Sequence, residues 1–355
     1  MGIRPRLWTA VASFAAHFKP SSDAPMHKHV SFSVLHGLVD PATGQPAVRC
    51  FAEVYPGYPV RKHVPDGMRA WDVSFDAYDP PEFTHATVEA GPVWAHPPRL
   101  DDQMWAALRE EGHPVWDVSL GKLTFVKVGD AIAVDDDVGV DGLPRRRMLN
   151  PAGRTGLAGR GILGKYGQNP ASDLIVARRN RTTKKREFLT ILRADTKQLS
   201  TTGGMVDPED TDEVAESATT GLVKAGIREL IEEALSNGDE VLEELKAFLK
   251  TAGNLRCIDG GFVDDVRNTD HARMVTGVFV CLLPDELADK IELQERNDEA
   301  SGIAWRTYDE IVEHPAGVFA SHKTYFAKAD AYIATLLQER VVAASTDRAT
   351  KVARR

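Results

Sequence analysis

The segment from Gly203 to Leu235, GGMVDPEDTDEVAESATTGLVKAGIRELIEEAL, decides how the rest of the chain is interpreted. Its second half has the spacing of an amphipathic helix. On that helix Glu229, Glu232 and Glu233 stand at i, i+3 and i+4, so their side chains share one face. Three neighbouring carboxylates repel one another, and a cluster of oxygen ligands suits Mg²⁺ or Mn²⁺. The segment therefore predicts a divalent-metal site on a helix. The alternative is the solvent-exposed face of an ordinary amphipathic helix.

The six residues Arg228–Glu233, RELIEE, resemble the core of the Nudix box, G-x5-E-x7-R-E-U-x-E-E-x-G-U, in which U is an aliphatic residue. Leu235 matches the last aliphatic position, whereas Ala234 stands where the pattern has its last glycine. The resemblance implies a Nudix hydrolase. In this interpretation Arg228 is a structural partner of a nearby carboxylate and not a substrate ligand.

The beginning of the box departs from the pattern. Gly204 resembles its opening glycine but lies 228 − 204 = 24 residues before Arg228, ten more than the pattern has, which indicates an insertion in the loop. Thr220 takes the position of the first glutamate. That carboxylate is therefore either lost or supplied by Glu213 or Glu216 of the inserted loop.

Further motifs narrow the resemblance. NPAGRTGL at Asn150–Leu157, GGMVDP at Gly203–Pro208, RNTD at Arg267–Asp270 and ASH at Ala320–His322 occur in the same order in the ADP-ribose pyrophosphatases of the Nudix family. The chain is also similar to a related ADP-ribose-binding channel domain. The resemblance implies an α/β (α+β) fold, in which a Nudix α/β/α sandwich follows a smaller β-rich N-terminal domain, with ADP-ribose bound in the cleft between them.

The activity that the resemblance implies is hydrolysis of the pyrophosphate bond of ADP-ribose to AMP and ribose 5-phosphate, with Mg²⁺ or Mn²⁺ as cofactor. On the terminal ribose, Asp270 is expected to accept hydrogen bonds from hydroxyl groups. The implied site consists of the metal ligands Glu229, Glu232 and Glu233, the further catalytic residue Asp265, and the substrate-binding residues Arg154, Gly204, Arg267, Asn268, Asp270, Ser321 and His322.

The general base stays open, because a base is identified by its distance to the attacking water and not by spacing. The candidates are Asp264, Asp265, Glu295, Glu299 and Glu229 itself.

Two other classes of function also stay open. The chain could be a sensor that binds ADP-ribose without turnover, which the displaced first glutamate favours and the intact RELIEE core opposes. It could instead hydrolyse another nucleoside diphosphate derivative, because the box specifies the chemistry and not the substrate.

A glycine-rich run, NPAGRTGLAGRGILGKYGQN, occupies residues 150–169. Glycines let backbone amides approach a ligand closely, and Arg154, Arg160 and Lys165 add positive charge, so a phosphate contact is chemically reasonable. The alternative is a tightly packed crossing that needs glycine for conformation alone. The spacing matches neither a Walker A loop nor a dinucleotide-binding turn, and it does not decide between the two.

Composition limits the possible partners. A net charge of −9 over 355 residues argues against non-specific nucleic-acid binding. Three widely spaced cysteines indicate neither a disulfide framework nor a thiolate zinc site. No apolar run is long enough to predict a membrane span. We expect a monomer whose partner is a small molecule.

The predicted domain organisation has five parts. Residues 1–23 carry Arg4, Arg6 and Lys19, no acid before Asp23 and apolar residues at helical spacing, which is typical of a mitochondrial transit peptide, and a cytoplasmic location is the alternative. A β-rich domain is expected at 24–149, a glycine-rich connector at 150–170, the Nudix domain at 171–340 and a disordered tail at 341–355.

Hydrophobic periodicity predicts the elements of secondary structure. A polar connector is expected where the β-rich domain ends, at DDDVGVDGLPRRR (135–147). Helices are expected at 101–112, across the RELIEE segment, at 239–249 and at 323–339, and strands at 73–75, 123–128, 174–177, 188–192, 261–263, 275–283 and 302–306.

Overall fold

The computed structural model describes residues 55–117, 121–127, 134–138, 144–211, 218–294 and 300–353. The predicted transit peptide and the candidate carboxylates Glu213, Glu216, Glu295 and Glu299 lie outside these residues. The chain divides into two compact units. Unit 1 comprises Met1–Ser172, Gly204–Ala225 and Asp259–Gly277, and unit 2 comprises Asp173–Gly203, Gly226–Ile258 and Val278–Arg355.

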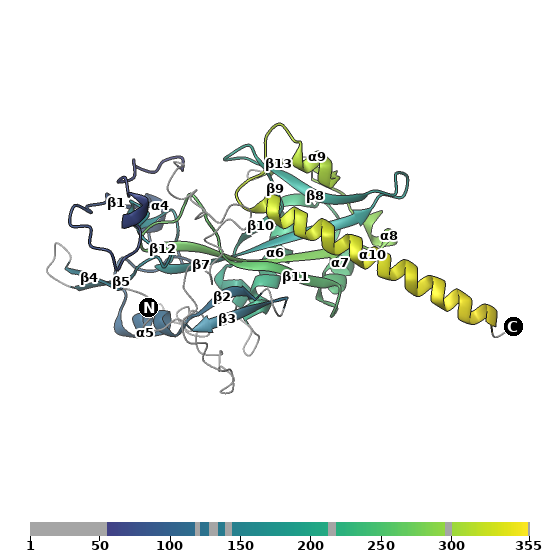
Figure 1. The fold of residues 1–355 in the computed structure, drawn as a ribbon, viewed down its shortest axis with the longest axis horizontal. Helices are drawn as coiled ribbons and strands as arrows, with labels where there is room; N and C mark the ends of the chain where they lie inside the picture. The colour runs from purple at the N-terminus through teal and green to yellow at the C-terminus, as the bar shows by residue number, and fades with distance from the viewer. Residues whose placement is uncertain are drawn as a thin grey trace, which may run out of the picture. The chain divides into compact units, whose positions relative to one another are not determined.

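The first half of the described chain contains short elements (Figure 1). They are η1 (Asp66–Met68), β1 (Glu82–Thr84), α4 (Ala86–Glu89), α5 (Asp102–Glu110), β2 (Gly112–Asp117), β3 (Lys122–Lys127), β4 (Val134–Val138), β5 (Pro144–Met148) and β6 (Ala158–Gly161). Three two-stranded sheets pair β1 with β6, β2 with β3, and β4 with β5.

Longer elements follow in the second half of the chain. They are β7 (Gly167–Arg179), β8 (Arg186–Arg193), β9 (Leu199–Ser200), β10 (Thr202–Met205), η3 (Pro208–Thr211), α6 (Ala218–Ala234), α7 (Asp239–Lys250), β11 (Leu255–Phe262), β12 (Ala272–Leu282), α8 (Asp285–Ala288), β13 (Ala300–Arg306), α9 (Tyr308–Val312) and α10 (His322–Ala353). None of the described helices is long and apolar enough to cross a bilayer.

One seven-stranded sheet is the centre of this second half. Its strand order is β11-β12-β7-β8-β13, with β10 paired to β7 and β9 paired to β8. All eleven residues of β12 are buried, as expected of a strand that is covered on both faces. Strands β7, β11 and β12 contribute residues to both units.

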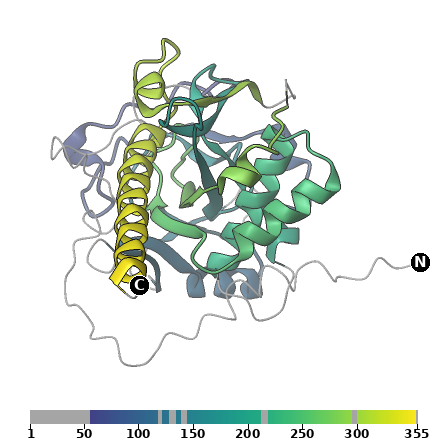
Figure 2. The ribbon, with the colours of Figure 1, turned by 90° about the vertical axis from the view of Figure 1, so that its right-hand side faces the viewer.

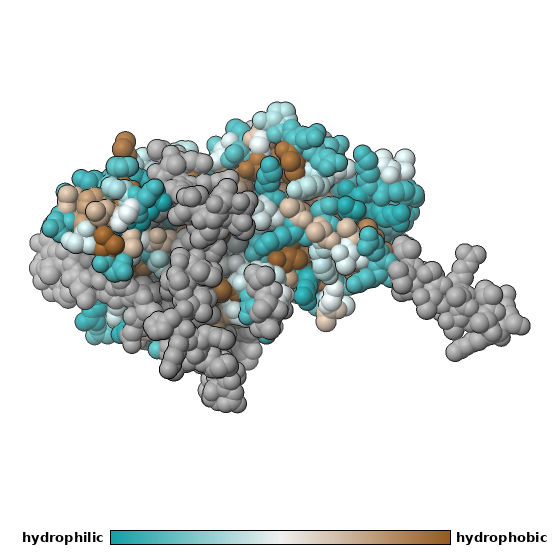
Figure 3. All heavy atoms as spheres, viewed as in Figure 1, coloured by the Kyte–Doolittle hydropathy of each residue, from teal (hydrophilic) through white to brown (hydrophobic). Residues whose placement is uncertain are grey.

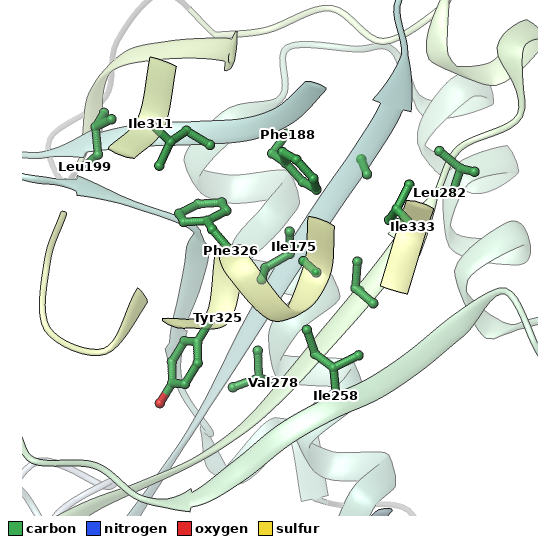
Figure 4. Packing of buried hydrophobic residues seen from close by; sticks show 13 residues of the cluster. Ile175, Phe188, Leu199, Ile258, Val278, Leu282, Ile311, Tyr325, Phe326 and Ile333 are labelled. Atoms are coloured by element: carbon green, nitrogen blue, oxygen red, sulfur yellow. The ribbon is translucent and has the colours of Figure 1, made fainter. Parts of the chain in front are cut away.

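The hydrophobic core of unit 2 joins α10 to this sheet. Phe326 and Ile333 of α10 pack with Ile175 of β7, Phe188 of β8 and Val278 of β12 (Figure 4). Figure 2 shows the yellow α10 on one side of the strands and the green α6 and α7 on the other. Helices on both faces of the sheet match the predicted α/β/α arrangement. On the face drawn in Figure 3, hydrophobic residues of the described part form small separate groups.

The last helix is longer than predicted. Instead of ending near residue 339, α10 runs for 32 residues to Ala353, through most of the stretch expected to be a disordered tail. The sequence offers a reason, because no glycine or proline follows Gly317 and alanine, arginine and lysine are good helix formers. Packing against the core reaches Leu336 and Leu337.

Most other predicted elements of secondary structure are confirmed. Asp101 caps α5 by accepting a hydrogen bond from the Met104 amide, and the predicted strands from residue 123 onward lie within or next to β3, β7, β8, β11, β12 and β13. The strand predicted at 73–75 is wrong, because this segment forms turns closed by hydrogen bonds such as the one from the Tyr78 amide to the Phe75 carbonyl.

The polar connector predicted at 135–147 is also wrong. Its two ends pair as the antiparallel strands β4 and β5, in a register that sets Asp135, Asp136 and Asp137 opposite Arg147, Arg146 and Arg145. Opposite charges on facing positions favour pairing of two strands that are otherwise too polar to be recognised as strands.

The glycine-rich run packs closely against an earlier part of unit 1. A Cβ atom on Gly156 would lie 2.1 Å from the Lys62 carbonyl oxygen, and one on Gly159 would lie 2.3 Å from the Phe83 carbonyl oxygen. Both glycines have positive φ, and the Lys62 amide donates to the Gly156 carbonyl at 2.8 Å. The packing alternative therefore explains these glycines, because no side chain fits between the two backbones.

We expect Gly156→Ala to lower the free energy of unfolding far more than Gly57→Ala. Both residues have positive φ, which costs an added Cβ about 1 to 2 kcal/mol. Only the Cβ on residue 156 meets another backbone, since nothing lies within 4 Å of a Cβ on residue 57. Overpacking should add about 1 to 3 kcal/mol. Urea unfolding of both variants measures the difference, and equal losses would contradict the packing interpretation.

A buried histidine holds the end of the same run. His96 is 6% exposed, and its Nδ1 accepts a hydrogen bond from the Tyr166 amide at 3.2 Å. Burial, together with the positive charges of Lys165 and Arg160, lowers the pKa of His96 to about 3. The imidazole is therefore neutral in the folded protein at any pH near neutrality.

Acid should destabilise the fold through His96. Its unfolded pKa of about 6.5 exceeds the folded value, so its contribution is complete above pH 6.5 and is lost as the pH falls toward 3. We compare the native chain with His96→Gln, whose amide can accept the hydrogen bond from Tyr166 but does not titrate. As the pH falls, the free energy of unfolding of the native chain should decrease more steeply than that of the variant, by on the order of 1 kcal/mol per pH unit. Parallel pH profiles from chemical unfolding would refute this.

Candidate active site

Helix α6 buries two of the three predicted carboxylates. Glu229 and Glu233 are 8% and 6% exposed, whereas the Glu232 side chain is 59% exposed. Residues four apart lie one helical turn apart, so Glu229 and Glu233 are neighbours on the buried side. Thr220 lies nine residues before Glu229 on the same helix, which is two and a half turns, and therefore faces the opposite side.

Arg228 bridges two of these carboxylates. Its Nη1 donates to Glu229 Oε1 at 2.9 Å and to Glu232 Oε2 at 3.2 Å. This confirms the expectation that Arg228 is a structural partner of a carboxylate. The exposed Glu232 is held to the arginine and not turned toward Glu233.

A strand edge in unit 2 positions Glu233. The Gly203 amide donates to Glu233 Oε2 at 2.9 Å, and the Thr201 amide donates to His322 Nδ1 at 3.2 Å. Gly203 lies in β10 and Thr201 directly precedes this strand, so one short stretch of backbone donates both to the Glu233 carboxylate and to the His322 ring.

Two buried carboxylates on successive turns are hard oxygen donors, which Mg²⁺ and Mn²⁺ prefer. Glu229 and Glu233 therefore fit such an ion as ligands. Among the described residues, however, no group of three or more His, Cys, Asp or Glu side chains is arranged to hold a metal. The predicted cluster of three carboxylates is reduced to a pair because Glu232 lies outside the buried face.

The predicted substrate loop, residues 264–270, belongs to unit 1. Its Asp265 is 2% exposed and pairs with Arg267 through two hydrogen bonds, Nε to Oδ1 at 2.8 Å and Nη2 to Oδ2 at 2.7 Å. The Arg267 carbonyl also accepts a hydrogen bond from the Tyr58 hydroxyl. Both oxygens of Asp265 are thus held by one guanidinium, so the structure favours a structural role for Asp265.

Asn268 and Asp270 are both buried in the same loop. Asn268 Nδ2 donates to the Val263 carbonyl at 2.8 Å, and its Oδ1 accepts from the Met274 amide at 2.8 Å. These two hydrogen bonds tie the loop to β12 at a residue with no exposed surface. The side chain is therefore turned into the protein and not toward a ligand.

The Asp270 carboxylate is surrounded by hydrogen-bond donors from its own unit. Oδ1 accepts from the Thr155 amide at 2.6 Å and the Thr155 hydroxyl at 2.8 Å, and Oδ2 accepts from the Tyr78 hydroxyl at 2.5 Å. Burial raises the pKa of this carboxyl, while His271 and the hydrogen bonds oppose the shift. At 2% exposure, Asp270 links Thr155 to Tyr78, which differs from the predicted ribose-binding role.

Arg154 also has a structural environment. Its Nη1 donates to the carbonyls of Met68 at 2.8 Å and Ala70 at 2.5 Å, and its guanidinium lies 4.9 Å from the centre of the Trp71 ring. The side chain is 8% exposed. Its Nη1 is therefore bound by backbone carbonyls, and its charge lies against an aromatic ring.

The other predicted residues differ in exposure. Asp264 is 8% exposed, and Gly204 and Ser321 are half-buried. Phe319, two residues before Ser321, is 7% exposed, and the Arg193 guanidinium lies 4.4 Å from the centre of its ring. One face of the ring is thus already occupied by a cation.

The structure also brings forward a residue that the sequence analysis missed. Asp173 Oδ1 lies 3.6 Å from His322 Nε2, whereas the Thr201 amide contacts the other ring nitrogen, Nδ1. A signal was present, since Asp173 is an acid placed directly before the apolar run Leu174–Ala177. Its partner is 149 residues away in the chain, so spacing alone could not identify the pair.

Comparison with known proteins identifies the family to which this fold belongs. Residues 64–167 match the family model described as NUDT9-like, N-terminal domain. A Caenorhabditis elegans protein that carries a nudix hydrolase name is 32% identical over 75% of this chain and 88% of its own length. The mitochondrial ADP-ribose pyrophosphatase of Rattus norvegicus is 32% identical over 76% of this chain and 74% of its own length.

A channel subunit is also related. The transient receptor potential cation channel subfamily M member-like 2 of Nematostella vectensis is 33% identical over 77% of this chain, which corresponds to 17% of the channel. The α/β architecture and the carboxylate helix define a Nudix fold. The chain belongs to the NUDT9-like Nudix hydrolase family, and the predicted family and fold class are confirmed.

We expect Asp270→Ala to destabilise unit 1. The substitution leaves three buried donors without their acceptor, which should cost about 3 kcal/mol or more of unfolding free energy. Asp66→Ala is the matched control, because that carboxylate is 90% exposed and makes a surface ion pair with Arg69 that contributes at most about 1 kcal/mol. Thermal unfolding compares the two. An unchanged melting temperature in Asp270→Ala would leave a ligand-binding role as the better explanation.

Proposed function

We propose that this protein hydrolyses the pyrophosphate bond of ADP-ribose to AMP and ribose 5-phosphate. The observation that carries the proposal is the buried pair Glu229 and Glu233 on α6, with the Gly203 amide bound to Glu233. The choice of ADP-ribose is supported by the name of the rat relative, an ADP-ribose pyrophosphatase.

The cofactor in this proposal is Mg²⁺ or Mn²⁺, with Glu229 and Glu233 as its ligands and Glu232 bound through water. When bound, such an ion neutralises pyrophosphate charge and activates a water molecule. The chain's own groups hold the ligands in place. Arg228 orients Glu229, and the Gly203 amide orients Glu233, so neither carboxylate has to be ordered when the substrate binds.

The general base stays open in this proposal. Asp265 is held by Arg267 and Glu229 is held by Arg228, so ion pairing does not choose between them, and Asp264 is the third described candidate. Glu295 and Glu299 lie outside the described residues and stay candidates from the sequence alone. A proton acceptor must come within hydrogen-bond reach of the attacking water, directly or through a second water.

Binding without turnover is the second candidate function. It is supported by the 33% identity with a channel subunit and by Thr220 at the position of the first Nudix glutamate. A third candidate is hydrolysis of another nucleoside diphosphate derivative, since the carboxylate pair acts on the pyrophosphate that all of them share. The monomeric state and the mitochondrial location remain predictions.

We expect Glu233→Gln to lower kcat by at least about 100-fold, because it removes one charge from the metal-binding pair while keeping the side-chain volume. Glu232→Gln is the control from the same helix turn, and its exposed side chain should make its loss much smaller. The assay is product chromatography of AMP at saturating Mg²⁺, on samples with matched melting curves. Equal losses in the two variants would assign the metal to the whole cluster and not to the buried pair.

A substrate panel separates the candidate functions. Hydrolysis of ADP-ribose in preference to other nucleoside diphosphate derivatives supports the proposal. Micromolar binding of ADP-ribose with no product selects the sensor, and preference for a nucleotide sugar selects the third candidate.

A further inference from the structure

Two side chains from one short segment of unit 1 bind three consecutive carbonyl groups of the loop 264–270. Arg61 Nη2 donates to the Val266 carbonyl at 2.7 Å and to the Asn268 carbonyl at 2.8 Å. Between these two, the Arg267 carbonyl accepts a hydrogen bond from the Tyr58 hydroxyl at 3.0 Å. The partners are 205 to 209 residues apart in the chain. The loop is therefore shaped by groups that its own sequence does not contain.

The next two carbonyl groups of the loop are bound by Asn150. Its Nδ2 donates to the Thr269 carbonyl at 3.0 Å, and its amide donates to the Asp270 carbonyl at 2.7 Å. All five carbonyl groups from residue 266 to residue 270 thus have a donor from outside the loop. A segment that is neither helix nor strand needs such donors, because burying a carbonyl group without one is costly.

The segment that contains Tyr58 and Arg61 is anchored to the glycine-rich run as well. The Tyr58 hydroxyl accepts a hydrogen bond from the Ile162 amide at 2.7 Å, and Arg61 Nη1 donates to the Thr155 carbonyl at 3.3 Å. A Cβ atom on Gly161 would lie 2.0 Å from the Tyr58 hydroxyl oxygen, so glycine leaves the room that this hydroxyl needs. Each of the two side chains therefore connects the glycine-rich run to the loop.

Arg267 is the predicted substrate-binding residue of this loop that keeps accessible surface. Its side chain is 20% exposed, whereas Asn268 and Asp270 are 0% and 2% exposed. The Arg267 guanidinium is paired with Asp265, but that carboxylate belongs to the same loop. The ion pair moves with the loop, so its place in unit 1 is set by the contacts that the loop makes with other segments.

We propose that Tyr58 and Arg61 are positioning residues that hold Arg267 in place for the substrate. The inference rests on the proposed function for the identity of that substrate. Both residues act through carbonyl groups of the loop and not by contact with the substrate. A planar guanidinium suits this task, because it directs several N–H groups at two segments at once, whereas a lysine ammonium is a single point. Fixing a binding group before the substrate arrives lowers the entropy cost of binding.

Hydrogen exchange of the full chain tests whether Arg61 holds the loop. In Arg61→Ala two of the five carbonyl groups lose their donor. The amides of residues 268 and 269, which donate to the carbonyls of Asp265 and Ala272, should then exchange at least about tenfold faster. The amides of β12 from residue 275 to 282 should keep the native rate. Unchanged exchange in the loop, or an equal increase in β12, would overturn the proposal.

Steady-state kinetics with ADP-ribose and Mg²⁺ tests whether the position of the loop matters for the substrate. Arg61→Ala should raise KM about tenfold, the effect of about 1.4 kcal/mol of lost binding, with nearly native kcat. Arg61→Lys should recover part of this loss. Tyr58→Phe keeps the ring and removes the hydroxyl, so its KM should rise less. A native KM in Arg61→Ala despite faster loop exchange would refute the positioning role.

Lys62→Ala is the matched control, because it removes the neighbouring cation, whose residue is exposed, and leaves the backbone contacts in place. It should retain native KM, kcat and loop exchange. A change in KM as large as that of Arg61→Ala would assign the effect to surface charge and overturn the proposal.

The same variants separate this proposal from the proposed function. If the native chain forms no product, the Kd of ADP-ribose from calorimetry takes the place of KM. A tenfold higher Kd in Arg61→Ala would then support the positioning role while the hydrolase fails. Hydrolysis by the native chain with an unchanged KM in Arg61→Ala would retain the hydrolase and refute the positioning role. Absence of ADP-ribose binding to the native chain would overturn both.

Discussion

The close approach of two backbones at the glycine-rich run is the constraint on which unit 1 depends. The Lys62 carbonyl occupies the space that a side chain on Gly156 would need, and the Lys62 amide bonds to the Gly156 carbonyl. A Cβ on Gly153 would likewise lie 2.3 Å from the Arg69 carbonyl oxygen, between Met68 and Ala70, to whose carbonyls Arg154 donates. Glycine packing and the polar contacts of Arg154 therefore hold the same two backbone segments together.

The sequence predicted the long elements of the second half of the chain better than the short elements of the first half, for a physical reason. Helix α7 and strand β12 are long and bury a continuous or periodic apolar surface, so their local sequence is sufficient to identify them. The aromatic segment at residues 71–78 has no such period. Trp71 and Tyr78 are ordered by the Arg154 guanidinium, 4.9 and 5.3 Å from their ring centres, and that partner is more than 70 residues away.

Residues that have equivalent positions in a sequence pattern can differ in how deeply they are buried. The helix period placed Glu229, Glu232 and Glu233 on one face, but it could not show that the edge of that face is exposed. In the same way, the order of motifs identified the family while leaving the roles of its residues open. Asn268 and Asp270 match a family motif, and in this chain their polar atoms are used to hold the loop.

A short segment, Thr201 and the beginning of β10, then sets the geometry of the candidate site in unit 2. The threonine hydroxyls at 201 and 202 both donate to the Leu174 carbonyl, at 2.8 and 2.9 Å, which ties the strand to β7. Its amides hold His322 and, two residues on, Glu233. A shift of this strand would move the first turn of α10 and the Glu233 carboxylate together. The positions of the His322 ring and of the Glu233 carboxylate are thus both tied to β7 through the backbone of residues 201–203, because the amides that hold these side chains belong to the segment that Leu174 fixes.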